Sequence, residues 1–411
     1  MLFLSRERAL VYSWMLVVAY TLAAIVLLIV NERYSTASNI RFGSDYVLYY
    51  ATSQVLHEHS PKDVYAITIL DAYESKAAGV AMGQALPMIY PPPFLFFALP
   101  LRLLPFPASL LAFLCVTTGL FYVTLARFGP VGLPLPLPLL VFSFPAVFAA
   151  IVNGQNGLLT GAFLGGALLL AGRRDVWSGL CLGLAFYKPH LALPALVALA
   201  AGGHRAAVVT CLGTVFGLYA GSLAVFGIGT WQAFFDNARL AQQLLSGEAF
   251  PLAKMMSAYA AARGLGCPNA VAMAVQIVVS VAALGAVAFV WRSPADRCLR
   301  VAVASVCILL FPYYSFGYDW VVLLVGLACL FSYAQRTGLA FSAWEKGVIG
   351  LAYVSPLLAF ALSVKTGVQI APFALCSLLW VLLRFVRSER RAGQWPTAAA
   401  GPLTGSGPAV R

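Results

Sequence analysis

The sequence predicts an all-α polytopic membrane protein, a bundle of about 12 transmembrane helices. Three observations lead to this class. Hydrophobic residues make up 61% of the chain and charged residues only 10%, whereas a soluble domain carries roughly 25% charged residues. Apolar runs that approach the roughly 20 residues needed to cross a bilayer recur along the chain. These runs are continuous and do not alternate with polar residues, which excludes a transmembrane β-barrel.

Charge and cysteine patterns narrow the class further. The formal net charge is +12, but the basic residues cluster between apolar runs, as in the cytoplasmic loops of membrane proteins. We therefore expect membrane lipids, and no nucleic acid, among the partners. The eight cysteines mostly lie inside apolar runs without a C-x-x-C pair, which is typical of small buried residues. The sequence predicts no metal site and no cofactor.

The first apolar run, Leu10 to Val30, follows Arg6 and Arg8 near the N-terminus. It is longer than the core of a signal peptide and ends without a small-residue cleavage site, so we expect it to remain as a start-transfer span. Residues 1–9 should then form a short cytoplasmic segment before the membrane-embedded domain, residues 10–386.

The polar segment 31–90 follows and is the first predicted periplasmic loop. Ser44 to His57 and Lys62 to Ala78 both combine one apolar flank with polar residues, and neither is long or apolar enough to span. Such segments are typical of amphipathic helices that lie in the membrane interface, where aromatic rings are favoured. Three consecutive prolines from Pro91 onward then stiffen the chain where the next apolar run begins.

The middle of the chain contains apolar runs of different quality. Phe94 to Leu104 and Ala108 to Arg127 are strongly apolar, whereas Val131 to Val152 contains four prolines and should be irregular or kinked. The sequence Asn153-Gly154-Gln155-Asn156-Gly157 interrupts this region, and Leu158 to Ala171 continues it.

Two short runs come next, Trp177 to Tyr187 and Leu191 to Ala201, with Lys188-Pro189-His190 between them. Each is only about a dozen residues long, too short to cross a bilayer comfortably. One interpretation is a pair of short helices that descends and returns with the charge at its turn. The other is a single helix broken at the proline.

The rest of the chain holds the remaining spans and a second large periplasmic loop, residues 227–266. The spans are predicted at Ala206 to Phe226, Ala270 to Trp291, Val301 to Phe311, Val321 to Tyr333, 346–364 and 369–386. Residues 387–411 should form a cytoplasmic tail. It is rich in proline, glycine, alanine and serine beyond Gly393, which predicts disorder.

The basic turns between the spans predict the orientation of the chain. They lie at 173–174, 204–205, 292–300, 336 and 384–391, and all are compatible with one cytoplasmic side. The polar segments that would then share the periplasmic face are 31–90, 188–190, 227–266 and 312–320. Counting every apolar run gives about 13 and would leave the basic C-terminus outside. We therefore expect one run within 131–172 not to span, which leaves about 12 spans.

The polar residues gathered on the outer face predict a chemistry. They are Asp45, His57, His59, Lys188, His190, Lys254, Arg263 and Asp319. Ionisable groups at membrane depth are costly to bury, so a functional role is the first hypothesis for them. One carboxylate facing several cations suits transfer of a group away from a phosphate. Asp45 would deprotonate an acceptor hydroxyl as general base, and lysine or arginine would stabilise the charge of the departing phosphate.

Each of these residues also has a purely structural interpretation. The alternatives are a helix cap or ion pair for Asp45, extension of the charge to the interface for Lys188, a hydrogen bond to a freed carbonyl for His190, a tie between helices for Asp319, and solvation for His57 and His59. The residues alone do not decide between these alternatives and the chemical role.

Several motifs occur in a fixed order along the chain. They are Gly43-Ser44-Asp45-Tyr46 with Tyr49-Tyr50-Ala51, Tyr90-Pro91-Pro92, Asn153-Gly154-Gln155-Asn156-Gly157-Leu158-Leu159-Thr160, Gly179-Leu180 through Gly183-Leu184-Ala185-Phe186-Tyr187-Lys188-Pro189-His190, and Pro312-Tyr313-Tyr314 with Tyr318-Asp319. In this order, over roughly residues 10–385, the chain resembles glycosyltransferase family 87, the polyprenyl-phosphate-mannose-type glycosyltransferases of the GT-C superfamily.

The resemblance implies an inverting transferase that moves a hexose, best known as mannose, from a polyprenyl-phosphate-sugar donor to a lipid or glycan acceptor. It implies a bacterial inner-membrane enzyme with a periplasmic active site, metal-independent chemistry and Asp45 as base. The residues proposed to bind the donor phosphate or substrate are Lys188, His190, Lys254, Arg263, Tyr318, Asp319 and Gln155. Many GT-C enzymes carry a pair of acidic residues in the first loop. Here Ser44 precedes Asp45, which leaves a single base.

Two other functions compete with this interpretation. A lipid or sugar transporter or flippase would also place polar residues on broken helices, but transporters tend to show matched interruptions in inverted repeats, and none is visible in the sequence. The long first outer loop is also not expected of a transporter. A non-catalytic assembly protein of the same fold is the third function, and the presence of Asp45 argues mildly against it.

Overall fold

The computed structural model of the chain describes residues 6–33, 42–79, 87–246 and 252–391. Within these residues the regular structure is helical, and an isolated β-bridge joins Met255 to Phe316. The predicted all-α class is confirmed. The disorder predicted beyond Gly393 concerns residues outside the described part of the chain.

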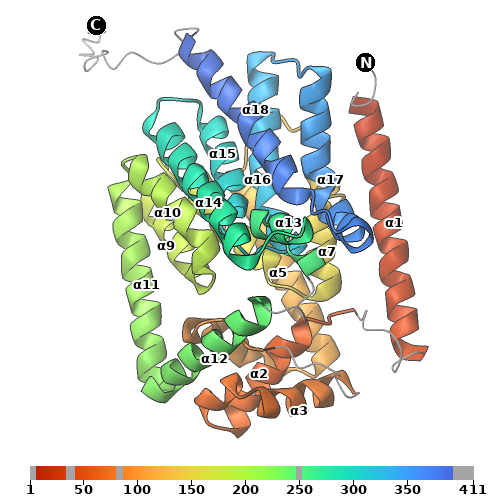
Figure 1. Cartoon of the computed structure of the whole chain (residues 1–411), viewed down its shortest axis with the longest axis vertical. Coiled ribbons are helices and arrows are strands. Elements are labelled where there is room, and N and C mark those ends of the chain that lie inside the picture. Colours follow the sequence, from red (N-terminus) through yellow and green to blue (C-terminus); the bar gives the residue numbers. More distant parts are fainter. Residues whose placement is uncertain (1–5, 34–41, 80–86, 247–251, 392–411) are drawn as a thin grey trace, which may run out of the picture.

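Figure 1 colours the helices in chain order. The α-helices are α1 (Arg6–Arg33), α2 (Tyr46–Glu58), α3 (Ile67–Ala78), α4 (Leu95–Ala98), α5 (Phe106–Phe128), α6 (Leu137–Phe142), α7 (Pro145–Asn153), α8 (Gly157–Leu170), α9 (Asp175–Leu184), α10 (Pro189–Ala201), α11 (Arg205–Phe226), α12 (Ile228–Ser246), α13 (Ala258–Gly264), α14 (Asn269–Arg292), α15 (Arg297–Leu310), α16 (Val321–Thr337), α17 (Ala343–Thr366) and α18 (Ala371–Arg391). Six 3₁₀ turns connect them: η1 (Pro61–Tyr65), η2 (Pro92–Phe94), η3 (Leu99–Leu103), η4 (Ala185–Tyr187), η5 (Leu252–Lys254) and η6 (Gly317–Trp320).

Seven helices among the described residues are long and apolar enough to cross a membrane. They are Glu7–Ile29, Phe106–Phe128, Arg205–Phe226, Asn269–Arg292, Gly317–Thr337, Ala343–Thr366 and Ala371–Arg391. Three shorter apolar helices are Pro92–Leu103, Gly157–Leu170 and Pro189–Ala201. The chain is therefore a multi-pass membrane protein. The count of about 12 spans stays a prediction.

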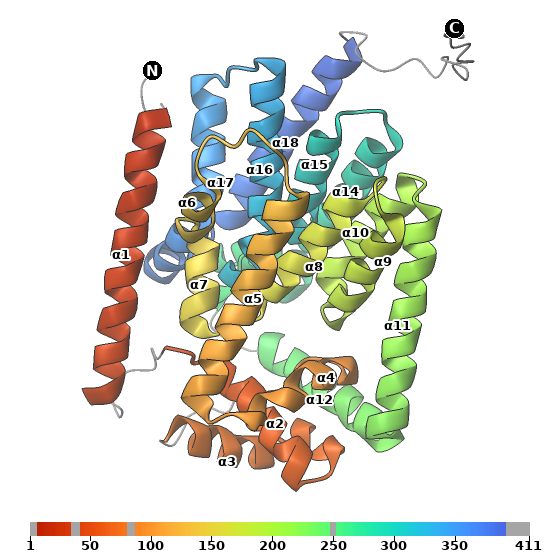
Figure 2. The same ribbon diagram turned by 180° about the vertical axis from the view of Figure 1, so that it is seen from behind.

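The helices form two layers along the long axis of the molecule (Figures 1 and 2). A small layer contains α2, α3 and α12, and a larger bundle contains α8 to α10 and α14 to α18. Helices α5 and α11 run from the bundle into the small layer, while α1 stands at the side. Most of α1 is exposed, and its Tyr20 packs on Phe148 with 4.3 Å between ring centroids. An exposed apolar helix of this length suits lipid surroundings.

Several bundle helices are too short to cross a bilayer and end inside the molecule. Helix α10, at 13 residues, is about 20 Å long, against a bilayer core of about 30 Å. His204 Nδ1 lies 3.3 Å from Asp175 Oδ1, so the end of α10 lies beside the start of α9. The two helices therefore descend and return, as in the first of the two interpretations, and Lys188 lies at their turn.

The basic turns gather at the end of the bundle that is opposite the small layer. Arg336 Nη2 lies 3.0 Å from Asp296 Oδ1, and the backbone N–H of Asp296 donates to Glu389 Oε2 at 3.0 Å. At the same end Arg384 Nη1 lies 3.5 Å from Glu345 Oε1. The start of α1 and the end of α18 also lie at this end (Figure 1).

The proline-rich region between α5 and α8 is irregular, as its composition predicts. The chain is not helical from 131 to 136, then forms α6, breaks at Ser143 and Phe144, and continues as α7. Helix α7 ends at Gly154, whose φ of +66° lies in the left-handed region that favours glycine. This ending turns the chain toward Gln155.

The first polar segment differs in detail from its prediction. Helix α2 begins at Tyr46, and its first eight residues, through Ser53, are all buried, so α2 packs on more than one side. The second predicted helix divides into η1 and α3, because Ala66 between them has an extended backbone with φ −84° and ψ 104°. That α2 and α3 lie at a membrane interface stays a prediction.

Candidate active site

Asp45 lies in a short segment directly before α2, residues 42–45, which we call the strap. The backbone N–H of Gly43 donates to Val152 O at 2.7 Å and that of Asp45 to Asn153 O at 3.0 Å, so the strap is fixed to the end of α7. Gly43 has a φ of +75°, a conformation that glycine adopts without strain. The turn can therefore form directly before Asp45.

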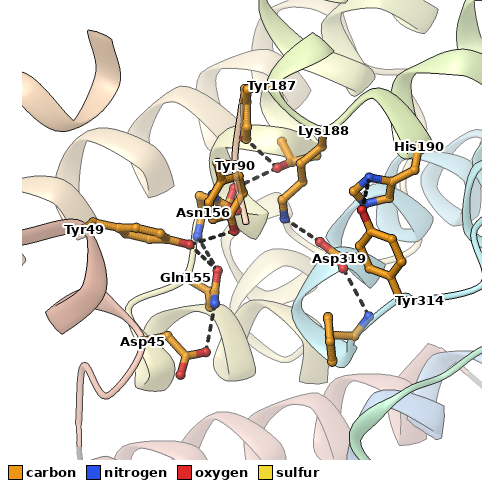
Figure 3. Close-up of polar contacts among 12 residues, drawn as sticks. Asp45, Tyr49, Tyr90, Gln155, Asn156, Tyr187, Lys188, His190, Tyr314 and Asp319 are labelled. Atoms are coloured by element: carbon orange, nitrogen blue, oxygen red, sulfur yellow. Dashed lines mark hydrogen bonds and ion pairs between the residues drawn. The ribbon is translucent and has the colours of Figure 1, made fainter. Parts of the chain in front are cut away.

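The side chain of Asp45 serves neither structural alternative. It occupies the N-cap position of α2 but makes no capping hydrogen bond, and it has no ion pair within 4.0 Å among the described residues. Its Oδ2 accepts a hydrogen bond from Gln155 Nε2 at 2.8 Å (Figure 3). Asp45 thus faces the turn between α7 and α8.

Burial raises the pKa of the Asp45 carboxyl above its ordinary value. The hydrogen bond from Gln155, the positive charge of Lys254 and the nearby Ser44 hydroxyl each act in the opposite direction and favour the carboxylate. A carboxylate with a raised pKa is a stronger proton acceptor once it is ionised. The surroundings of Asp45 therefore suit a general base.

Gln155 connects Asp45 to two tyrosines. Its Oε1 accepts hydrogen bonds from Tyr49 Oη at 2.6 Å and from the Asn156 backbone N–H at 3.2 Å. The Tyr49 hydroxyl also lies 3.0 Å from the Tyr90 hydroxyl (Figure 3). The chain of contacts from Asp45 thus passes through Gln155 and Tyr49 to Tyr90.

Lys188 and Asp319 form a buried ion pair on the other side of Tyr90. Lys188 Nζ lies 2.7 Å from Asp319 Oδ1, and the two residues are only 4% and 3% exposed. The Lys188 ammonium also lies 5.3 Å from the ring centroid of Tyr318 and 6.0 Å from that of Tyr90. Lys188 therefore does not extend to a surface.

Asp319 also stabilises its own turn, in addition to pairing with Lys188. Its Oδ2 accepts a hydrogen bond from the Phe316 backbone N–H at 3.1 Å, which closes the turn before α16. His190, two residues beyond Lys188, pairs through Nδ1 with the Tyr314 hydroxyl at 2.9 Å. The structure thus gives His190 a tyrosine partner in place of a freed backbone carbonyl.

A cavity of about 420 Å³ opens beside the ion pair. Lys188, His190, Tyr318 and Asp319 line it, and ten of its lining residues are aromatic: Tyr90, Tyr187, Tyr219, Trp231, Phe234, Phe235, Tyr313, Tyr314, Phe316 and Tyr318. Helix α11 and helix α12 of the small layer together supply one wall of the cavity. Asp45 and Gln155 do not line this cavity, and Tyr90 stands between the two halves.

The other two basic candidates, Lys254 and Arg263, differ in their contacts. Lys254 is exposed, and its segment is held in place because Met256 N–H donates to Ser315 O at 2.7 Å and Gln369 Nε2 donates to Met255 O at 2.8 Å. Arg263 instead donates to Cys267 O at 3.1 Å and does not line the cavity. Of the two, Lys254 is the one whose charge acts on the Asp45 carboxyl.

Two glycines allow the Gln155 turn to pack closely against its neighbours in this site. A Cβ on Gly154 would lie 2.6 Å from Tyr46 Cβ, and a Cβ on Gly157 would collide with the carbonyl oxygen of Tyr318. The close approach is possible only without side chains at both positions. The turn thereby contacts the Asp45 strap on one side and the Asp319 turn on the other.

The family model of glycosyltransferase family 87 matches residues 88–314, more than half of the chain. The chain belongs to glycosyltransferase family 87. No curated protein and no solved structure matches it significantly. Membership in family 87 makes the chain a membrane glycosyltransferase, with a sugar donor and an acceptor as its substrates.

The region matched to family 87 contains Gln155, Lys188 and His190 but neither Asp45 nor Asp319. Those two carboxylates join the site through the tertiary contacts described above. Among the described residues, no group of three or more histidine, cysteine or acidic side chains could hold a metal ion.

Sequence reasoning did not assign a site role to Tyr49, Tyr90 or the aromatic residues of α11 and α12. Tyr49 and Tyr90 belong to the motifs that carry the family 87 resemblance. That membership is the one feature of the sequence that could have indicated a role for them in the site. Two histidines that the sequence gathered on the outer face are bound elsewhere: His57 Nδ1 lies 2.8 Å from Ser53 O and His59 Nε2 lies 3.0 Å from Tyr73 Oη.

Proposed function

We propose that this family 87 member is an inverting transferase. It moves a hexose, with mannose as the first candidate, from a polyprenyl-phosphate-sugar to a lipid or glycan acceptor. The observation that carries the proposal is a carboxylate that accepts a hydrogen bond from Gln155, Asp45, across Tyr90 from a buried lysine, Lys188, which lines an aromatic cavity. A base on one side and a cation on the other are what displacement at a sugar phosphate requires.

In this mechanism Asp45 takes the proton of the acceptor hydroxyl. The acceptor oxygen forms a bond to the anomeric carbon from one face, and the bond from that carbon to the phosphate oxygen breaks on the opposite face. The electron pair leaves with polyprenyl phosphate, whose charge Lys188 stabilises. Inversion requires base and leaving group on opposite faces of the sugar, so the acceptor would approach from the Asp45 side of Tyr90 and the phosphate would leave on the Lys188 side.

The remaining polar residues take supporting roles in the proposal. Lys254 favours the ionised form of Asp45, because its charge lowers the pKa of that carboxyl. Asp319, His190 and Tyr318 line the cavity beside Lys188 and would contact the sugar or its phosphate. Arg263 is the weakest of the candidates, since its guanidinium donates to the Cys267 carbonyl.

The aromatic cavity supports a lipid-linked donor. Aromatic rings offer flat faces to a sugar and apolar surface to a prenyl chain. Phe235 on α12 lines the cavity and is also 54% exposed, which supports lateral approach of the donor from the membrane. We further propose a GT-C-like bundle of about 12 spans in the bacterial inner membrane, with α2 and α3 at the periplasmic interface.

The test is transfer of radiolabelled sugar from polyprenyl-phosphate donors to a membrane lipid extract by purified protein. Asp45→Asn keeps the shape of the side chain and removes the base, so we expect a loss of about 10²-fold or more. Asp236→Asn is the matched control, because the Asp236 side chain is 74% exposed and lies 3.3 Å from Arg239 Nη1 on the same helix, α12. Full activity in Asp45→Asn would assign the base elsewhere, with Asp319 the next candidate.

A transporter or flippase is the second candidate function. Half-depth helices around a buried ion pair are also found in transporters, and α9, α10 and the Lys188–Asp319 pair have this form. If no donor supports transfer by the parent protein, but vesicles containing it move a labelled polyprenyl-phosphate sugar between leaflets, this second function replaces the first.

A further inference from the structure

The amide of Gln155 has only one favourable orientation. Its Oε1 can only accept and its Nε2 can only donate hydrogen bonds. Tyr49 Oη at 2.6 Å and the Asn156 N–H at 3.2 Å are both donors next to Oε1, and the Asp45 carboxylate at 2.8 Å is an acceptor next to Nε2. Turning the amide over would place an oxygen against the carboxylate and an NH₂ group against an N–H. The donors and the acceptor around the amide therefore fix its orientation.

The hydroxyl proton of Tyr49 is committed to this arrangement. A hydroxyl has one proton, and Gln155 Oε1 can only accept it, so the contact between Tyr49 and Tyr90 must have Tyr90 as donor. Tyr49 is 1% exposed and Gln155 is 7% exposed, so water has little access to replace either partner. The direction of donation thus runs from the cavity wall through Tyr49 to Gln155, whose Nε2 donates to Asp45.

We propose that Tyr49 is a positioning residue for the base: its hydroxyl locks the Gln155 amide so that an N–H always faces the Asp45 carboxylate. The inference rests on the proposed role of Asp45. It assigns to Gln155 a task on the base rather than on the substrate. The aromatic ring of Tyr49 has a separate packing role, against Phe94 at 5.3 Å and Tyr90 at 5.8 Å between centroids.

The groups that face Asp45 determine how the pKa of its carboxyl should change in Tyr49→Phe. They are Gln155 from the turn between α7 and α8, Lys254 from η5, Ser44 from the strap, and the phenol groups of Tyr49 and Tyr318. The N–H of Gln155 stabilises the ionised form of Asp45, so its loss favours the protonated form. In Tyr49→Phe the amide oxygen keeps only the Asn156 N–H as a donor, so the pKa of Asp45 should rise.

The experiment is an infrared titration of Asp45 in purified full-length protein, isolated by subtracting the spectrum of Asp45→Asn at each pH. It reads the carboxyl directly and needs no turnover, so its result is independent of whether a donor has been found. Tyr49→Phe should titrate at higher pH than the parent. The matched control is Tyr50→Phe on the same helix, whose hydroxyl donates to Leu104 O at 3.1 Å and is not connected to Gln155; its Asp45 titration should be unchanged.

A second variant tests whether Tyr49 acts through Gln155. Gln155→Met keeps the length of the side chain and removes the amide, and it should shift the titration at least as far as Tyr49→Phe. The double variant should shift no further than Gln155→Met alone, because both changes remove the same hydrogen bond. An unchanged titration in Tyr49→Phe, or shifts that add in the double variant, would overturn the proposal. Loss of sugar transfer in Asp45→Asn tests the proposed function separately.

Discussion

The Lys188–Asp319 pair gives a prediction that can be worked from its geometry. Asp319→Asn keeps the size of the side chain, and the new amide oxygen can still accept the Phe316 N–H that Asp319 accepts at 3.1 Å. It removes the negative charge that lies 2.7 Å from Lys188 Nζ. The lysine would then be left buried without a carboxylate partner, with the rings of Tyr90 and Tyr318 near its ammonium.

The expected cost follows from the burial of the pair. Removing one partner of a buried ion pair costs about 3–5 kcal/mol, because the other charge stays buried without compensation. The ring contacts of Lys188 are present in the parent protein as well and do not offset this loss, so we expect about 3–5 kcal/mol in the free protein. The double variant Lys188→Met with Asp319→Asn removes the unpaired charge and should recover most of this loss.

A phosphate ligand should reverse the effect. Polyprenyl phosphate offers Lys188 a new anion, and in Asp319→Asn it no longer competes with a carboxylate. We therefore expect polyprenyl phosphate to raise the unfolding temperature of Asp319→Asn more than that of the parent protein, and uncharged polyprenol to raise both equally. The assay is thermal unfolding of the detergent-solubilised protein with each lipid. Two results would refute this account of the pair. One is equal stability of the parent protein and Asp319→Asn, and the other is equal protection of Asp319→Asn by polyprenol and by polyprenyl phosphate.

Two further predictions concern the neighbours of this pair and of Asp45. Lys254→Gln should raise the pKa of Asp45, because the Lys254 charge lowers it, and move the acidic limb of the pH–rate profile to higher pH. In the parent protein added salt should move the limb the same way, since Lys254 is exposed; an unmoved limb in the variant contradicts the contact. Gly157→Ala should cost about 1–3 kcal/mol of stability, read as a lower unfolding temperature, because its Cβ would meet the Tyr318 carbonyl. Gly213→Ala, with nothing within 4 Å, is its control and should be neutral.

The class of the protein and part of its path follow from the sequence. The share of apolar residues and their runs decide that helices cross a membrane, because an unsatisfied backbone group in lipid is too costly for other structures. The prolines of 131–152 predict the irregular path that separates α6 from α7. The helix count was less accessible, since α9 and α10 have the apolar character of spans but only half their length.

The sequence also marked single residues of the site without relating them. Asp45 is unusual next to a span in a chain with 14 acidic residues, and Lys188 and Asp319 interrupt apolar runs. These signals found the charged groups. They did not indicate that Lys188 pairs with Asp319, that Arg263 donates to the Cys267 carbonyl, or that the charge of Lys254 acts on Asp45.

Only the tertiary structure decided which polar groups became partners. The bonds that make the site join residues 110 apart in the chain, Gln155 to Asp45, and 131 apart, Lys188 to Asp319. Hydropathy and turn signals act over one or two helical turns and cannot encode such pairs. The pairs form because short helices end inside the molecule, where each freed polar group must find a partner. The sequence by itself determined that polar groups would be buried, and the packing of α7, α8, α10 and α16 determined which of them would meet.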